Sequence, residues 1–450
     1  MRANSPGRSS IASAALVLAA GIAAWPAEPL RLIMLDPGHF HAAQLHATML
    51  SGFSDEARVY APLGPELAAH INRVSTYNER AENPTHWKLN VYAGPDFLAR
   101  MRSEPAGNVV VLSGRNDRKI DYIETSVRAG QNVLADKPWI IDSKDLPRLE
   151  AVLNLADTKR LVAYDAMTQR FDIAYQLQQA LVNDRNVMGQ PSSVLMESTH
   201  SLFKGSTRPV WFMNLGQQGE GMTDVGTHLV DLIEWTLFPG QAIEYKRDVR
   251  VLEARRSPLM LSKADFAKVT GVSKWPAFAE PFLRNDEFAY FVNNDVSFSM
   301  KGVRARCSVK WDCEAPNGLR DTMLAVYTGS NAQVQVRQDK EEQFLPEVDV
   351  IPADPARRVA VRAALQTRLE KLASEYPGLT VADRGKALRV VIPASLRIPD
   401  EQYFALLTAR FLGYMRNPGT LPGWEKPNML TKYYITTRAV EMAREQERGH

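Results

Sequence analysis

The sequence has few cysteines and little net charge. Of its 450 residues only Cys307 and Cys313 are cysteines, and the formal net charge at pH 7 is +3. The two cysteines lie on one alternating stretch that predicts a single strand. Six residues of strand hold their Cα atoms much farther apart than the roughly 4.4–6.8 Å that a disulfide requires. We therefore expect free thiols that offer no metal site. Without a long basic run, the small charge argues against nucleic acid as a partner.

A hydrophobic run long enough to span a bilayer is also missing. The longest apolar stretch, residues 11–24, follows Arg2 and Arg8 and falls short of the roughly 20 residues that a membrane span needs. A basic start, a short apolar run and small residues at 23–27 are typical of a secretory signal peptide, here residues 1–27. The alternative is an N-terminal anchor. We expect a periplasmic or secreted protein with no stable membrane span after cleavage.

Residues 28–165 alternate between buried strands and amphipathic helices. Apolar strands are predicted at 30–36, 108–113 and 132–136, with helices at about 39–50, 119–129 and 144–156. Strands that alternate with helices are typical of an α/β domain with a doubly wound parallel sheet. We predict a Rossmann-like N-terminal domain that ends near residue 165.

The remainder, residues 166–450, changes character. A helix is predicted at 172–182, and residues 287–338 alternate in strand fashion between asparagine- and glycine-containing turns. This pattern predicts an α+β domain with an open antiparallel sheet. An amphipathic helix at about 356–374 lies in an insertion, residues 340–395, to which we assign no purpose. The tail at 399–443 is predicted to be helical.

Two polar motifs stand out. Asp224, His228 and Asp231 recur at i, i+4 and i+7, which places them on one face of a predicted helix. Far upstream, Asp136-Lys137-Pro138 follows a buried strand directly. Taken alone, the helix motif is equally consistent with a buried histidine that a neighbouring carboxylate satisfies.

Together the two motifs resemble the Gfo/Idh/MocA family of nicotinamide-dependent sugar and polyol oxidoreductases. The tail and the meander are similar to the oxidoreductase C-terminal domain of some secreted members. The resemblance implies catalytic roles for Lys137, Asp224 and His228, NAD or NADP as cofactor, a carbohydrate or polyol substrate and a homo-oligomer. Residues that could contact this substrate are Arg170, Lys432 and Tyr433.

The expected dinucleotide turn departs from its usual form. A G-x-G-x-x-G turn lets the backbone touch the pyrophosphate, but here Gly38 stands at the first glycine, Phe40 at the second and Ala43 at the third. No carboxylate for the ribose occurs in residues 60–64. Candidate cofactor-binding residues at the carboxyl edge of the sheet are Asp36, Gly38, His39, Phe40, Ser113, Asn116, Asp136, Lys137 and Pro138.

His39 and His41 with Asp36 also raise a metal hypothesis, because metal sites use histidine and carboxylate ligands. We favour the simpler interpretation that these are turn histidines packed beneath a ligand, and we predict no metal.

Three functions remain open. The first is an exported oxidoreductase with tightly held NAD(P), since free cofactor is not expected outside the cytoplasm. The second is a redox-neutral NAD-dependent glycosidase or lyase that uses the same residues. The third is a cofactor-free carbohydrate-binding or otherwise repurposed protein of the same fold.

Overall fold

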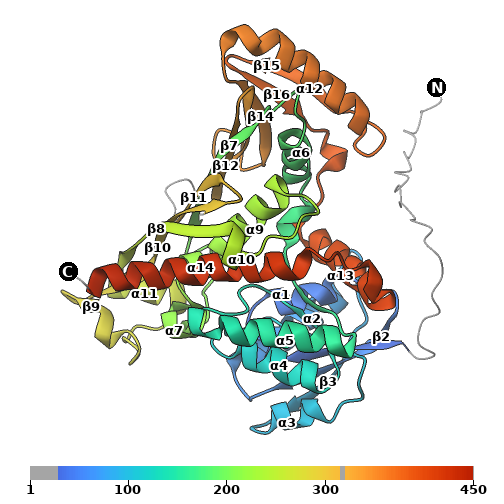
Figure 1. Ribbon diagram of the computed structural model, residues 1–450. Helices are drawn as coiled ribbons and strands as arrows, with labels where there is room; N and C mark the ends of the chain where they lie inside the picture. Colours follow the sequence, from blue (N-terminus) through green and yellow to red (C-terminus); the bar gives the residue numbers. More distant parts are fainter. Residues whose placement is uncertain (1–28, 315–319, 449–450) are drawn as a thin grey trace, which may run out of the picture.

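The computed structural model describes residues 29–314 and 320–448, which form two sheets joined by helices (Figure 1). The predicted signal peptide lies outside the described residues. Within these two ranges, no helix is long and apolar enough to cross a membrane.

The first sheet is parallel and six-stranded, in the order β3-β2-β1-β4-β5-β6. Its central strands are buried on both faces, which explains their continuous apolar sequences. The order reverses between β1 and β4, the point where ligands bind in open α/β sheets. The strands are β1 (Leu30–Leu35), β2 (Phe53–Ala61), β3 (Lys88–Ala93), β4 (Val109–Leu112), β5 (Asn132–Ala135) and β6 (Ala163–Asp165).

Helices cover both faces of this sheet, so the predicted Rossmann-like fold is confirmed. They are α1 (His41–Gln44), α2 (Pro65–Glu79), α3 (Phe97–Arg102), α4 (Lys119–Arg128) and α5 (Leu146–Lys159). The helix predicted at 39–50 is much shorter: α1 is one turn and passes into the 3-10 turn η1 (Leu45–Ala47). The sequence pattern missed β3 because this edge strand is largely exposed and lacks an apolar run.

The second sheet has ten strands in the main order β15-β16-β14-β13-β12-β7-β11-β10-β8, with β9 paired to β10. Burial alternates along β7, β10 and β12, so one face is covered and the other is open. The strands are β7 (Pro191–Ser201), β8 (Val249–Leu261), β9 (Leu283–Arg284), β10 (Glu287–Met300), β11 (Val303–Asp312), β12 (Thr322–Gly329), β13 (Ala332–Gln338), β14 (Glu347–Pro352), β15 (Thr380–Arg384) and β16 (Ala387–Val391).

The predicted meander over residues 287–338 is interrupted. Strand β7 lies between β11 and β12 and pairs in parallel with β11. The turn signals of residues 293–331 could not reveal this, because the intervening strand comes from about a hundred residues upstream. Cys307 lies within β11 and Cys313 follows it, and both are free as predicted.

The second domain places its helices mainly on the covered face of this sheet (Figure 1). They are α6 (Ile173–Val182), α7 (Leu215–Gln218), α8 (Gly221–Asp224), α9 (Gly226–Leu237), α10 (Tyr245–Asp248), α11 (Lys263–Thr270) and α12 (Arg358–Leu372). The motif helix is thus two segments, α8 and α9, joined at Val225 in a helical conformation.

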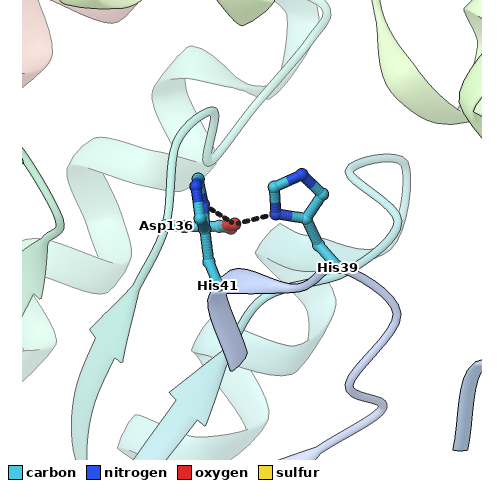
Figure 2. Close-up of side chains that lie close together, drawn as sticks. All are labelled: His39, His41 and Asp136. Carbon is cyan, nitrogen blue, oxygen red and sulfur yellow. Dashed lines mark hydrogen bonds and ion pairs between the residues drawn. The ribbon is translucent and has the colours of Figure 1, made fainter. Parts of the chain in front are cut away.

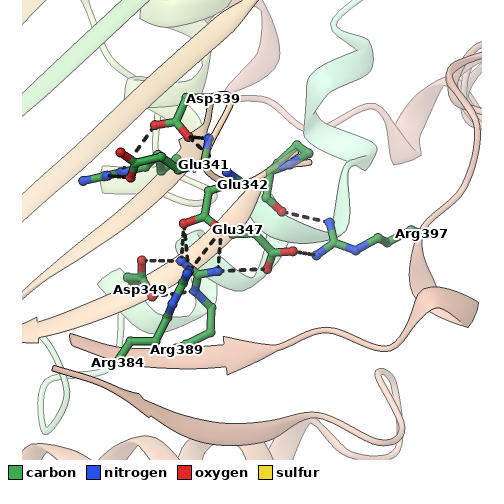
Figure 3. Close-up of polar contacts among 10 residues, drawn as sticks. Asp339, Glu341, Glu342, Glu347, Asp349, Arg384, Arg389 and Arg397 are labelled. Carbon is green, nitrogen blue, oxygen red and sulfur yellow. Dashed lines mark hydrogen bonds and ion pairs between the residues drawn. The ribbon is translucent and has the colours of Figure 1, made fainter. Parts of the chain in front are cut away.

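The insertion at 340–395 extends the sheet with β14, β15 and β16 and adds helix α12. A buried ion-pair cluster fixes it, as Figure 3 shows: Arg389 bonds Asp349 at 2.6 and 2.8 Å and Glu342 at 2.8 Å. Arg397 bonds Glu347 at 2.6 Å. These contacts hold the polypeptide that runs from the insertion back to the cavity described below.

The C-terminal tail crosses back to the first sheet. Helix α13 (Asp400–Arg416) packs Phe404, Leu407 and Phe411 into a core shared with β1, β2 and β4. Helix α14 (Glu425–Arg448) lies between the two sheets in Figure 1 and contributes Tyr433 to the core beside β5. The tail therefore packs against both sheets and joins them.

Candidate functional site

A cavity of about 1390 Å³ lies between the carboxyl edge of the first sheet and the second domain. From the first domain it is lined by Gly38, His39, Phe40, His41, Arg73, Arg115, Asn116, Asp136 and Lys137. From the second it is lined by His200, Arg208, Trp211, Asp224, His228 and Trp311. Of the predicted cofactor residues, Asp36, Ser113 and Pro138 are not among its lining.

Three predicted catalytic residues meet in this cavity. Lys137 follows β5 in a turn that a cis Lys137–Pro138 bond completes, and its ammonium donates to an Asp224 carboxylate oxygen. His228 lies one turn further along the motif helix and lines the same cavity. Two segments 87 residues apart in the chain thus form one charged pair beside one imidazole.

The electrostatics keep the Asp224 carboxylate ionised and the His228 imidazole neutral. Burial raises the pKa of Asp224, but the Lys137 ammonium outweighs it, so that the pKa lies below its ordinary value. Burial, together with Lys137, lowers the pKa of His228 to about 3. The imidazole of His228 is therefore neutral at neutral pH, and the one ring nitrogen that carries no proton can accept a hydrogen bond or a proton.

Buried histidines should make the protein sensitive to mild acid. Burial lowers the pKa of His228 and of His46 to about 3 and that of His70 to about 4, against 6.5 ordinarily. The unfolded chain then binds more protons below about pH 6.5, so stability is full above this pH and falls as the pH drops toward 4. Between its folded and unfolded pKa values, each histidine lowers the free energy of unfolding by up to about 1.4 kcal/mol for each unit that the pH falls.

Urea unfolding at about pH 7 and about pH 5 tests this expectation. We expect a clearly lower free energy of unfolding at the acidic pH, and a shallower pH dependence in His46→Phe than in the exposed-site control His86→Phe. An unfolding midpoint that does not change between the two pH values would contradict it.

The expected substrate contacts of Arg170, Lys432 and Tyr433 are not found. All three are buried away from the cavity. Arg170 donates to both oxygens of Asp231 at 2.6 and 2.8 Å, and Lys432 donates to Asp231 at 2.8 Å. Tyr433 donates to Asp165 at 3.3 Å. These residues form a structural network, and Asp231 belongs to it, although it shares the motif helix with Asp224 and His228.

The turn after β1 does not form the usual phosphate cradle. The backbone N–H groups of Gly38 and His39 both donate to the carbonyl of Ser113, at 2.9 and 3.1 Å. These donors are therefore occupied, and Phe40 adds a side chain that is 44% exposed. The turns after β1 and β4 touch so closely that a Cβ at Gly114 would lie 2.6 Å from the Asp36 carbonyl oxygen.

The cavity nevertheless carries the charge that a dinucleotide needs. Arg73 of α2 lies with its guanidinium 5.9 Å from the Phe40 ring centre. Arg115, after β4, bonds Glu66 at 2.9 Å and lines the same cavity. Guanidinium groups bind phosphate oxygens strongly. The residues present fit a dinucleotide whose phosphates are held by arginine side chains in place of turn backbone.

His39 and His41 converge, but on Asp136 and not on Asp36. Figure 2 shows both imidazoles directed at one oxygen of Asp136, with His41 Nδ1 at 3.3 Å and His39 Nδ1 at 3.6 Å. Asp36 instead accepts a hydrogen bond from Tyr122 at 3.1 Å. The sequence interpretation paired the histidines with the nearer aspartate, whereas parallel strand pairing brings the distant one beside them.

The carboxylate of Asp136 is strongly held. Lys119 donates to one oxygen at 2.5 Å and Ser113 to the other at 2.7 Å. Burial would raise the pKa of Asp136, but Lys119 and the two imidazoles outweigh it and hold the pKa well below its usual range. Burial and the neighbouring His41 lower the pKa of His39 well below its ordinary value.

Sequence reasoning missed the wall of the cavity that the second domain contributes. His200 of β7 lies 3.0 Å from Asp321, and its ring packs at a tilt against Trp311 with the ring centres 5.0 Å apart. The Arg208 guanidinium lies 5.4 Å from the Trp311 ring centre. Aromatic and polar groups of this kind suit a sugar. No spacing could reveal them, because they come from different strands and a loop.

Comparison with known proteins identifies the chain's relatives. A family model described as "Putative oxidoreductase C terminal domain" matches residues 177–444. A "putative oxidoreductase" from Parabacteroides merdae ATCC 43184 is 40% identical, with a TM-score of 0.89 over 93% of this chain and 98% of that chain. The chain belongs to the Gfo/Idh/MocA-like oxidoreductases. Membership confirms the predicted family and enzyme class. No curated protein matches the sequence.

Two further Gfo/Idh/MocA-type structures share the fold at low identity. A 3-ketoreductase from Actinomadura kijaniata, in complex with NADP, has a TM-score of 0.56 at 14% identity over 91% of this chain and 96% of its own. Levoglucosan dehydrogenase, in complex with NADH and levoglucosan, has a TM-score of 0.61 at 13% identity over 93% and 98%. At these identities the likeness shows the fold alone.

Proposed function

We propose that this protein is an exported oxidoreductase that transfers hydride between a sugar or polyol carbon and a tightly held NAD(P). The observation that carries the proposal is the meeting of Lys137, Asp224 and His228 on one cavity of about 1390 Å³. The named ligands of the structural relatives, NADP, NADH and levoglucosan, support the cofactor and substrate classes. Export rests on the signal-peptide pattern of the N-terminal residues.

Lys137, Asp224 and His228 each have a separate role in the proposed reaction. A bound nicotinamide would supply the hydride acceptor or donor. The neutral His228 accepts the proton of the substrate hydroxyl. Lys137 stabilises the negative charge that develops on the same oxygen. Asp224 holds the Lys137 ammonium in place and offers an acceptor for a neighbouring hydroxyl.

Arg73 and Arg115 would hold the cofactor phosphates, since the turn backbone is already bonded to Ser113. Such a side-chain cradle explains why Phe40 can replace the second glycine. It also predicts that affinity for the dinucleotide depends on guanidinium charge and weakens with salt.

The test is to denature the protein isolated from its native compartment and to assay released NAD and NADP, then to titrate the cofactor-free protein with each by calorimetry. We expect stoichiometric release, and binding that Arg115→Met weakens about tenfold to a hundredfold, the loss of one charge-assisted hydrogen bond. Arg128→Met, on the exposed end of α4, serves as the control.

Other outcomes decide against the proposal. No release and no binding at millimolar concentration would support the cofactor-free alternative. Bound cofactor with glycoside cleavage but no net formation of NAD(P)H or of oxidised sugar would support the redox-neutral glycosidase or lyase.

A further inference from the structure

We propose that His39, His41 and Asp136 form a binding site for a divalent transition-metal ion of the Zn²⁺ type, open to the cavity. The site goes beyond the proposed redox function, because neither the dinucleotide nor the substrate is needed to build it. It comes from His39 in the turn after β1, His41 at the start of α1 and Asp136 directly after β5 (Figure 2).

Two of the three separations match those of ligands around a tetrahedral ion. His39 Nδ1 and His41 Nδ1 lie 3.6 and 3.3 Å from the same Asp136 oxygen, and one ligand atom from each of the three residues lies within 4.8 Å of the other two. Bonds of roughly 2.0–2.2 Å in a tetrahedron place ligand atoms about 3.3–3.6 Å apart. A metal ion could therefore enter with small side-chain adjustments.

Hydrogen bonds within the cluster satisfy His41 but leave one buried nitrogen of His39 without a partner in the described part of the chain. His41 Nδ1 makes a hydrogen bond with Asp136, but His39 Nδ1 is buried without a hydrogen-bond partner in the described part of the chain. A buried polar atom without a partner is costly. One bound ion would satisfy both imidazole nitrogens and the carboxylate together.

The outer contacts are those that orient metal ligands. Ser113 donates to the ligating oxygen of Asp136 at 2.7 Å, and Lys119 donates to the other oxygen at 2.5 Å. Such partners fix the orientation of a ligating carboxylate. Because Lys119 already offsets the charge of Asp136, we expect weaker binding than at a cysteine-rich structural site.

Three protein ligands leave at least one coordination position for an outside oxygen. His39, His41 and Asp136 all line the cavity that contains Lys137 and His228, so this position faces whatever the cavity binds. The Phe40 ring lies 4.4 Å from each imidazole and shields one side. The oxygen could come from a phosphate or from a sugar hydroxyl.

The test uses the full-length protein, stripped by dialysis against a chelator and titrated with Zn²⁺ and Co²⁺ without dinucleotide. We expect one ion per chain, a Co²⁺ spectrum of tetrahedral intensity that Zn²⁺ abolishes, and a rise in Tm with Zn²⁺. His39→Gln and His41→Gln should each weaken ion binding at least about a hundredfold. Loss of a ligand should cost at least as much as loss of a residue that only orients a ligand, which costs about tenfold to a hundredfold. His86→Gln, exposed and remote, is the matched control.

Substoichiometric binding, or binding that both variants retain, would show an adventitious ion only and would overturn the proposal. Circular dichroism of the variants checks that they fold, and Ser113→Ala provides a milder variant with an expected tenfold to hundredfold loss of ion affinity.

Inorganic phosphate and glucose are then added separately to the Co²⁺ form, and the one that shifts the spectrum identifies the source of the oxygen. A spectrum unchanged by both would refute the claim that the ion serves the cavity. Because dinucleotide is absent throughout, failure here is distinct from failure of the proposed redox function.

Discussion

Lys137→Met is expected to lower kcat for oxidation of the best sugar or polyol substrate by about 10²–10³-fold. The ammonium contacts Asp224, and both residues line the cavity. It stabilises charge that exists only as the hydroxyl proton leaves, so its removal should affect kcat more than binding. The measurement is NAD(P)H formation across a panel of sugars and polyols, with cofactor Kd determined in parallel.

The exposed Lys144→Met, close in sequence and remote from the cavity, is the control for loss of a lysine. Because the Lys137→Met change would leave Asp224 buried without its cation, a second variant, Lys137→Met with Asp224→Asn, removes the unpaired charge. If the double variant folds as well as wild type and still lacks activity, the loss belongs to the reaction. Retention of more than about a tenth of wild-type kcat in Lys137→Met would disprove the assigned role.

Asp231→Asn is expected to lower the free energy of unfolding by about 3–5 kcal/mol. The carboxylate is 2% exposed and accepts three bonds, two from Arg170 and one from Lys432. Burial would raise the pKa of Asp231, but these two cations outweigh it and keep the pKa well below its usual range. Removing the negative charge leaves two buried cations undercompensated, although Glu425 and Asp165 still pair with them.

Urea unfolding at neutral pH measures this loss. Asp157→Asn, which removes an exposed ion pair with Lys426, should cost about 0–1 kcal/mol and serves as the comparison. A loss below about 1 kcal/mol for Asp231→Asn would show that the buried network around Asp231 does not stabilise the fold. The comparison distinguishes Asp231 in α9, whose role is structural, from Asp224 at the end of α8, which lines the cavity.

Local sequence patterns predicted much of the fold. Apolar strands such as β4 and β5 are recognisable because central parallel strands are buried on both faces. Helices α4, α5 and α6 follow from their 3.6-residue periodicity. Exposed β3 and the long edge strand β8 escaped prediction, since neither has a continuous apolar run.

Some residues of the candidate site were also predictable from the sequence, and others were not. The spacing of Asp224 and His228 predicted one shared helical face, and the turn that carries Lys137 follows directly from its strand. The resemblance of the two motifs to the family is what singled these residues out as catalytic. Arg170 and Lys432 could not be distinguished from site residues, because a charged side chain in a buried ion pair has no sequence pattern of its own.

The sequence by itself determined the alternating α/β domain, the free cysteines and the positions of the two polar motifs, because each depends on residues close together in the chain. Only the tertiary structure decided which charges are functional and which are structural. It directed Asp231 into a buried network and Asp224 toward Lys137. It also brought Asp136 to His39 and His41, since the parallel pairing of β1, β4 and β5 aligns their carboxyl ends across 95 residues of sequence.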